Sequence, residues 1–154
     1  MQKNEKQEIF QNLILQRSRS KIRKMKIIEG KNAVLGRLAS YVAKEALKGE
    51  EIIILNCNEV VITGNRENIK ENFEAKRKRV GSAQKGPKHS RNSERIVKRV
   101  IRGMLDRKGR GRAAYKKIKC YAETPAEFQN AKKIIVEKRK KSLNKFIQVK
   151  ELSK

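Results

Sequence analysis

The chain has 154 residues, of which 41 are lysine or arginine and 16 are aspartate or glutamate, so its formal net charge is +25. This length fits one compact domain with extensions, and the excess of positive charge predicts a polyanionic partner. The longest uninterrupted apolar run, residues 52–55, is far shorter than the roughly 20 residues of a membrane-spanning helix, so we expect no membrane span.

Residues 26–62 have the pattern of a β-α-β unit. Residues 26–29 form a short β-branched run, and residues 52–56 form a continuous apolar run of the kind that is buried on both faces of a parallel sheet. Between them, apolar residues recur with helical spacing over residues 34–47, and Gly49 follows as a C-cap. The pattern predicts two parallel strands connected by a helix.

Residues 60–63 and 118–121 are candidates for further short strands, and strands separated by helices imply an α/β sheet. A polar helix is expected from Asn65, with a basic run at its end over residues 76–79. Residues 81–92 contain glycine, proline and serine, so we expect a loop there.

The residues after Ser93, which we expect to be the N-cap, predict an amphipathic basic helix. Its apolar side, expected to pack on the sheet, consists of Ile96, Val97, Val100, Ile101, Met104 and Leu105. Its other side carries four cations, Arg95, Lys98, Arg99 and Arg102. We expect a glycine-rich basic loop over residues 106–112 and a lysine-rich tail beyond Pro125.

The positive charge is concentrated in the second half of the chain. Residues 27–63 contain four basic and five acidic residues, whereas residues 64–119 contain 20 basic and five acidic ones. Such an asymmetry is typical of nucleic-acid binding. Because aromatic residues make up only 5% of the chain, a module that stacks single strands is not favoured, and we expect structured RNA or DNA bound through phosphates and shape.

Catalytic and cofactor-binding patterns are missing from the sequence. Gly30 and Gly36 do not form a dinucleotide-binding or phosphate-binding glycine motif. His89 is the only histidine, and the basic loop around it should lower its pKa. Cys57 and Cys120 are most simply reduced core residues. We therefore expect no enzyme activity, no cofactor, no small-molecule substrate and no metal site.

Several short motifs occur in order along residues 26–125, and together they resemble the universal large-subunit ribosomal protein L13 family, in its archaeal and eukaryotic form. The motifs are Gly36-Arg37-Leu38-Ala39-Ser40, the 53–57 strand, Ile62-Thr63-Gly64-Asn65, the basic run 76–79, Gly86-Pro87-x-His89, Val100-Ile101-Arg102-Gly103-Met104-Leu105 and Arg110-Gly111.

The resemblance implies a three-layer α/β/α domain with a four-stranded parallel sheet, no catalytic activity and a structural place on large-subunit rRNA. The family's RNA-facing regions map onto this chain at Arg37, Lys76, Arg77, Lys78, Arg79, Lys85, Lys88, His89, Arg91, Arg95, Lys98, Arg99, Arg102, Arg107, Lys108, Arg110 and Arg112.

We expect three regions: a basic N-terminal extension over residues 1–25, an rRNA-binding core over residues 26–125, and a basic C-terminal tail over residues 126–154 that is helical on the ribosome. Apolar residues in both extensions, such as Ile9, Phe10, Leu13 and Ile14 in the first and Leu143, Phe146 and Ile147 in the second, are candidate helix faces that dock on neighbouring large-subunit proteins. The expected location is the cytoplasm, with assembly in the nucleolus if the source is eukaryotic. The alternatives are a free RNA- or DNA-binding regulator and a nucleotide-dependent enzyme.

Overall fold

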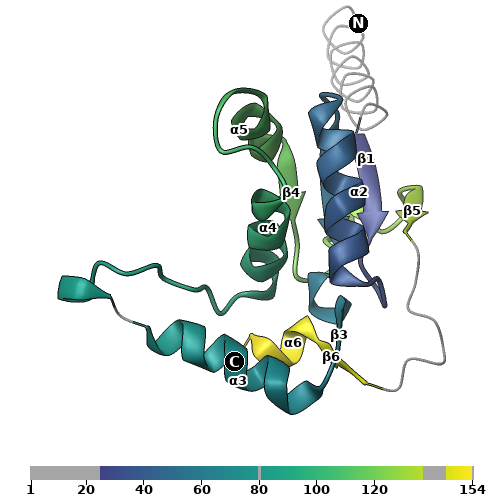
Figure 1. The fold of residues 1–154 in the computed structure, drawn as a ribbon. Helices are drawn as coiled ribbons and strands as arrows, with labels where there is room; N and C mark the ends of the chain where they lie inside the picture. The colour runs from purple at the N-terminus through teal and green to yellow at the C-terminus, as the bar shows by residue number, and fades with distance from the viewer. Residues whose placement is uncertain (1–24, 80, 137–144, 154) are drawn as a thin grey trace, which may run out of the picture.

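A four-stranded parallel sheet forms the centre of the protein. The computed structural model describes residues 25–79, 81–136 and 145–153 (Figure 1). In spatial order the strands are β4 (Ile118–Cys120), β2 (Glu51–Leu55), β1 (Met25–Glu29) and β5 (Lys133–Ile135). The predicted α/β class with four parallel strands is confirmed. The fourth strand, however, is β5, which lies in the segment expected to be a tail.

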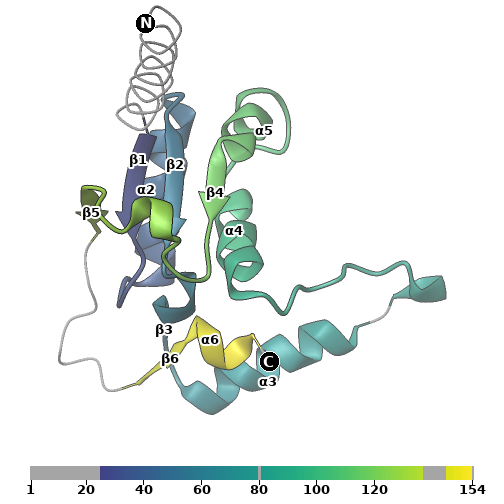
Figure 2. The same ribbon diagram turned by 180° about the vertical axis from the view of Figure 1, so that it is seen from behind.

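The sheet lies between two layers of helical structure. α2 (Leu35–Leu47), α4 (Ser93–Gly103) and α5 (Gly109–Lys116) lie together on one face. The chain between β4 and β5 crosses the other face with the short 3-10 helix η3 (Ala126–Phe128), as Figure 2 shows. This arrangement places an α/β core beneath α4, which carries four basic side chains.

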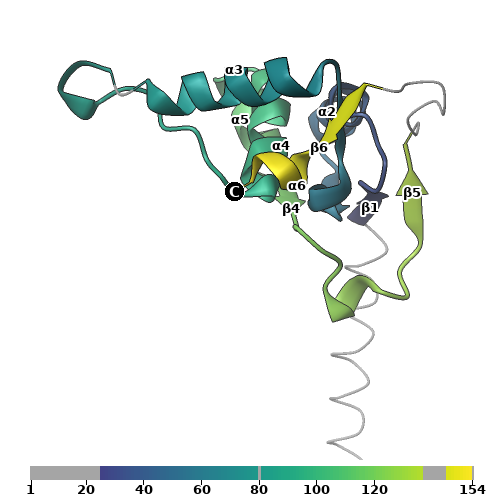
Figure 3. The same ribbon diagram turned by 90° about the horizontal axis from the view of Figure 1, so that it is seen from below.

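α3 (Arg66–Lys78) and the loop that follows it project from these layers (Figures 1 and 3). The helix begins where the sequence predicted, because the side chain of Asn65 accepts a hydrogen bond from the backbone N–H of Glu67 at 3.2 Å. None of its residues is fully buried. The following loop contains the 3-10 helix η2 (Ser82–Gln84) and leads back to α4.

A second, two-stranded sheet joins distant parts of the chain. β3 (Val61–Thr63), which follows the 3-10 helix η1 (Cys57–Glu59), pairs antiparallel with β6 (Phe146–Gln148), and α6 (Val149–Leu152) follows directly. The predicted strand over 60–63 therefore exists but lies outside the parallel sheet.

The C-terminal apolar residues pack on the chain itself. Phe146 and Ile147 lie in β6 and not on a helix face, and Ile147, Val149 and Leu152 are buried in the main core. Period-two alternation explains the difference, because Ile147 points inward while its neighbours Phe146 and Gln148 are only half-buried. Leu143 and the four apolar residues of the N-terminal extension lie outside the described residues.

The core has one large and one small part. The large part joins the inner face of α2, the apolar side of α4 and one face of the sheet, with Leu38, Val42, Ile54 and Ile101 all fully buried. The small part, on the other face, packs Phe128 against Ile27, Ile53 and Leu55. Each such side chain stabilises the fold by about 1.5–3 kcal/mol through burial. The two-faced burial of β2 explains its uninterrupted apolar sequence.

Three details of the region from α4 to α5 differ from the sequence-based expectations. The N-cap of α4 is Asn92, and the Ser93 hydroxyl instead donates a hydrogen bond to Asn58 Oδ1 at 2.5 Å. Met104 is 44% exposed, because it follows the last helical residue of α4 and lies beyond the core. The expected loop over 106–112 contains the first turn of α5, where a Cβ on Gly111 would lie 2.2 Å from the Asp106 carbonyl oxygen.

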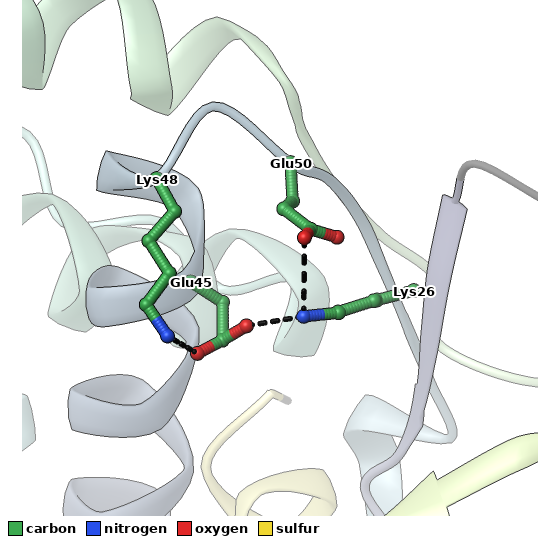
Figure 4. Close-up of polar contacts among 4 residues, drawn as sticks. All are labelled: Lys26, Glu45, Lys48 and Glu50. Carbon is green, nitrogen blue, oxygen red and sulfur yellow. Dashed lines mark hydrogen bonds and ion pairs between the residues drawn. The ribbon is translucent and has the colours of Figure 1, made fainter.

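A chain of ion pairs joins the end of α2 to β1 (Figure 4). The Glu45 side chain, only 10% exposed, receives Lys48 Nζ at 2.7 Å and also pairs with Lys26, whose Nζ lies 3.3 Å from Glu50. Hydrogen bonds from the two lysines hold the pKa of Glu45 below its usual value, and the bond to Glu45 raises the pKa of Lys26. These charges therefore stabilise the fold while Glu45 stays ionised.

Among the residues that the structure describes, no helix combines the length and the apolar character needed to cross a bilayer.

Candidate nucleic-acid interface

α4 separates its apolar and basic residues onto opposite sides. Ile96, Val97 and Ile101 are buried against the core, while Arg95, Arg99 and Arg102 are exposed and Lys98 is half-buried. The predicted amphipathic helix is confirmed, apart from Met104. Because packing fixes the apolar side, the cationic side has a fixed orientation relative to the sheet.

A groove of about 880 Å³ runs between α4 on one wall and α5 with β4 on the other. We call it the cationic groove. Seven of the side chains that line it are cationic and one is acidic. The cations are Lys88, Arg95, Lys98, Arg99, Arg102, Arg107 and Lys119, the acid is Glu94, and the remaining lining residues are Ser90, Gly103, Tyr115, Cys120 and Tyr121. Such a concentration of positive charge in a concave surface is complementary to phosphates.

The second wall contributes residues that the sequence analysis did not select. Tyr115, Lys119 and Tyr121 come from α5, β4 and the residue after β4. Lys98 Nζ lies 5.0 Å from the centre of the Tyr115 ring, and the Tyr121 ring packs against Phe128 with 6.0 Å between centroids. Lys119 and Tyr121 lie on the η3 side of the edge strand β4, since Lys119 is level with Ile53 and Tyr121 packs on Phe128, whereas Tyr115 packs on the α4 side.

His89 lies at the edge of this region and is held by α4. Arg99 donates a hydrogen bond to the Lys88 carbonyl oxygen at 2.9 Å, and its second terminal nitrogen lies 3.5 Å from His89 Nε2. Burial, followed by the positive charges of Arg99 and Lys76, lowers the pKa of His89. The lowered pKa was predicted, although burial is its largest cause. His89 is therefore neutral near pH 7.

The basic run at the end of α3 divides into two roles. Lys76, Lys78 and Arg79 are exposed, whereas Arg77 is half-buried and donates a hydrogen bond to the Leu152 carbonyl oxygen. Within the described part of the chain, Arg77 Nε is buried without a hydrogen-bond partner. Arg77 therefore connects α3 to α6, and the other three cations of the run face solvent.

The remaining predicted residues lie outside the groove. Arg110 donates a hydrogen bond to the Leu47 carbonyl oxygen at 3.3 Å, at the C-terminus of α2. The others are exposed side chains on α2, on the loop before α4 and near the start of α5, namely Arg37, Lys85, Arg91, Lys108 and Arg112. The cationic groove thus brings together six of the 17 predicted residues: Lys88, Arg95, Lys98, Arg99, Arg102 and Arg107.

The two cysteines are free thiols in different environments. Cys57 is fully buried in the main core, as expected, while Cys120 is partly exposed and lines the cationic groove. The hydrogen bond with Cys120, together with burial, raises the pKa of Cys57. Across residues 25–79, 81–136 and 145–153, no group of three potential metal-ligating His, Cys, Asp or Glu side chains occurs.

Gly30, which opens the first β-α connection, has a structural explanation. A Cβ there would lie 2.6 Å from the Leu55 carbonyl oxygen, and the Gly30 N–H donates to that same oxygen at 2.9 Å. The glycine therefore permits close backbone packing between β1 and β2. Its presence at this turn needs no bound nucleotide.

The fold and the cationic groove together define a basic α/β domain with a concave surface that is complementary to phosphates. The chain belongs to the family described as Ribosomal protein L13, whose sequence model matches residues 23–127.

Archaeal members of this family are similar to the chain. The protein of Methanocaldococcus jannaschii is 41% identical over 134 residues, which cover 84% of this chain and 96% of the relative. That of Methanopyrus kandleri is 46% identical over 106 residues, or 68% of this chain and 66% of the relative. That of Methanococcus maripaludis is 48% identical over 105 residues, which cover 66% of this chain and 77% of the relative. Each of these relatives is named large ribosomal subunit protein uL13.

Proposed function

We propose that the protein is a structural constituent of the large ribosomal subunit that binds folded rRNA, with no catalytic role. The observation that carries the proposal is the cationic groove. There α4 presents Arg95, Arg99 and Arg102, while its apolar side is buried in the core. The names of the archaeal relatives support the ribosomal assignment. On this proposal the protein is located on cytoplasmic ribosomes.

The RNA contacts that we propose are mainly electrostatic. Arginine on α4 binds phosphate through its planar fork, and a helix packed on a core holds such forks in place with little loss of entropy. The exposed cations at the end of α3, Lys76, Lys78 and Arg79, add positive charge to the projecting arm. Phosphate contacts position the protein but carry little sequence information. The shape of the RNA then decides where the protein binds.

The terminal segments have a separate proposed role. We propose that the N-terminal extension, residues 1–25, contacts neighbouring large-subunit proteins. Residues 145–153 of the C-terminal segment pack on α3 and β3 instead, so any contact that they make with a neighbour uses only their outer surface.

The test removes three charges from α4. Replacing Arg95, Arg99 and Arg102 with alanine should leave thermal unfolding nearly unchanged and weaken binding to large-subunit rRNA fragments. Each lost phosphate contact should reduce the slope of log affinity against log salt by roughly 0.7–0.9. The matched control replaces Lys31, Lys44 and Lys132, which are also exposed but lie outside the groove.

Equal losses in the two triple variants would show that only net charge matters and that α4 makes no specific contact. Retention of the protein on large subunits through a high-salt wash tests the ribosomal assignment. Release of the wild-type chain from subunits under that wash, with RNA binding intact, would favour a free RNA-binding protein.

A further inference from the structure

The two cysteines of the chain lie next to each other beside the cationic groove, and the proposed function uses neither of them. Cys57 follows shortly after β2, and Cys120 is the last residue of β4, the strand adjacent to β2 in the sheet. We propose that this pair of thiols is an oxidation site, at which a peroxide converts Cys57 and Cys120 to a reversible disulfide. The proposal does not depend on RNA binding.

The backbone places the two residues side by side. Ile54 of β2 pairs with Cys120 in the parallel register, and the Tyr121 N–H donates a hydrogen bond to the Ile54 carbonyl oxygen at 2.9 Å. Further along, the Cys57 N–H donates a hydrogen bond to the Tyr121 carbonyl oxygen at 3.0 Å. Cys57 therefore remains beside the end of β4 after β2 has ended.

Both thiols also lie on the same side of the sheet. Cys57 is fully buried in the main core, and Cys120 packs, partly buried, against that same core. The two side chains are joined by a hydrogen bond, so their sulfur atoms already face each other. A disulfide requires Cα atoms about 4.4–6.8 Å apart, which is compatible with the spacing of about 4.8 Å between neighbouring strands.

The difference in exposure between the thiols sets the order of the reaction. Cys120 is partly exposed and lines the groove, so a peroxide reaches it first. Burial and the contact with Cys120 raise the pKa of Cys57, so Cys57 does not react as a free thiolate. Cys57 enters the reaction only as the partner of an oxidised Cys120.

The reaction has two steps and balances with one molecule of hydrogen peroxide. The Cys120 sulfur attacks one peroxide oxygen, the O–O bond breaks, and the hydroxide that leaves takes up the thiol proton, which gives a sulfenic acid and water. The Cys57 sulfur then attacks the Cys120 sulfur and the S–O bond breaks. The departing hydroxide takes the Cys57 proton to form a second water. Two thiols are oxidised and the peroxide is reduced.

The disulfide closes the basic half of the chain into a loop. Residues 58–119 lie between the two cysteines and contain β3, α3, α4 and α5. They include all the predicted RNA-facing residues except Arg37. Because such a cross-link restricts mainly the unfolded chain, the oxidised protein should be more stable than the reduced one.

The experiment maps the cysteines of the full chain after treatment with hydrogen peroxide. Remaining thiols are alkylated in denaturant, and the protein is digested with trypsin. Cys57 is released in the peptide 49–66 and Cys120 in the peptide 120–132, and neither peptide contains methionine, so methionine oxidation does not affect the measurement. The two peptides should be recovered joined and lighter than their sum by two hydrogens. A dithiol reductant should separate them.

Thermal unfolding provides a second measurement on the same samples. The oxidised protein should melt about 5–15 °C above the reduced protein, and the reductant should reverse the shift. A cross-linked protein that melts below the reduced one would contradict the proposal, because the bond would then strain the native fold instead of fitting it.

Two variants test the order of the steps. In Cys120→Ser, Cys57 should remain reduced and available for alkylation in denaturant, because the core shields it from the peroxide. In Cys57→Ala, Cys120 should form a sulfenic acid that dimedone traps. Met104, which is 44% exposed, should be oxidised in every sample and so confirms that the peroxide was active. If Cys57→Ala fails to fold, the wild-type peptide map decides the question.

The proposal is overturned if wild-type Met104 is oxidised while both cysteines remain available for alkylation. Oxidation of Cys120 to a sulfinic acid without linkage to Cys57, or a disulfide between two copies of the chain through Cys120, would overturn it as well. None of these results bears on the proposed function, which is tested separately by the binding of rRNA fragments.

Discussion

α3 and α4 are basic helices of similar length, 13 and 11 residues, joined by a single loop, yet they are anchored in different ways. α4 has four buried residues, and its cations project from the core. α3 has none and is held by half-buried Ile69 and Phe73, an ion pair from Arg66 to Glu151 and the hydrogen bond from Arg77 to the Leu152 carbonyl. Similar basic sequences therefore form one rigid and one weakly anchored cationic surface.

The largest expected effect comes from removing a core side chain of α4. Ile101→Ala should lower the free energy of unfolding by about 2–5 kcal/mol, because Ile101 is fully buried. Phe73→Ala on α3 should cost less, since Phe73 is only half-buried. Urea denaturation measures both. Equal losses would mean that α3 is as firmly anchored as α4.

A smaller effect is expected at the contact between α3 and α6. Arg77→Ala should cost about 1 kcal/mol through loss of the hydrogen bond to Leu152, whereas Lys78→Ala should change stability by less than about 0.5 kcal/mol. The loss should appear as faster amide exchange in α3 and α6 with unchanged exchange in α4. Faster exchange throughout α4 as well would show that the two helices unfold as one unit.

The smallest effect concerns pH. The pKa values of Glu45 and Glu151 are held below their usual range, mainly by hydrogen bonds from Lys26 and Arg66, respectively. The stabilisation is complete above the unfolded-state pKa, about 4.3 for glutamate, and is lost as the pH falls through the lower folded-state values. The urea concentration at the midpoint of unfolding, measured between pH 7 and pH 3, should therefore decrease over this acid range.

Glu45→Gln should flatten that pH dependence, because the glutamine cannot titrate. Glu74→Gln, at an exposed position of α3, is the matched control and should leave the wild-type curve unchanged. If both variants lost stability at acid pH to the same extent as the wild type, the ion pairs of Figure 4 would contribute nothing to that loss.

The central elements could be predicted from sequence because their signals are local. β1, α2 and β2 follow one another, and the apolar run of β2 indicates burial on both faces. β5 and β6 were missed because each has three residues and its partner lies far back in the chain, as in the pairing of Ile28 with Ile134. Nearby lysines gave those segments the composition of a tail.

The candidate site was predicted on one wall only. Helical periodicity identified the cationic side of α4, but the other lining residues, such as Tyr115 of α5 and Lys119 of β4, come from later elements, and no local pattern encodes their approach to α4. Charge alone also could not distinguish the basic residues that face solvent from those that hold the fold together. Arg77 and Arg110 have the same chemistry as their exposed neighbours, yet the fold uses both to hold backbone carbonyls.

The ion pair between Arg66 and Glu151 also determines when α3 can be anchored during synthesis. The two residues are 85 positions apart, and ribosomes add about 5–20 residues per second, so Glu151 is made about 4–17 s after Arg66. β1, α2 and β2 precede α3 in the chain, so they have already been synthesised by then. Throughout that interval the nascent chain carries α3 without its ion pair to α6, so the anchoring of the arm, like the pairing of β3 with β6, is completed only when the last residues have been made.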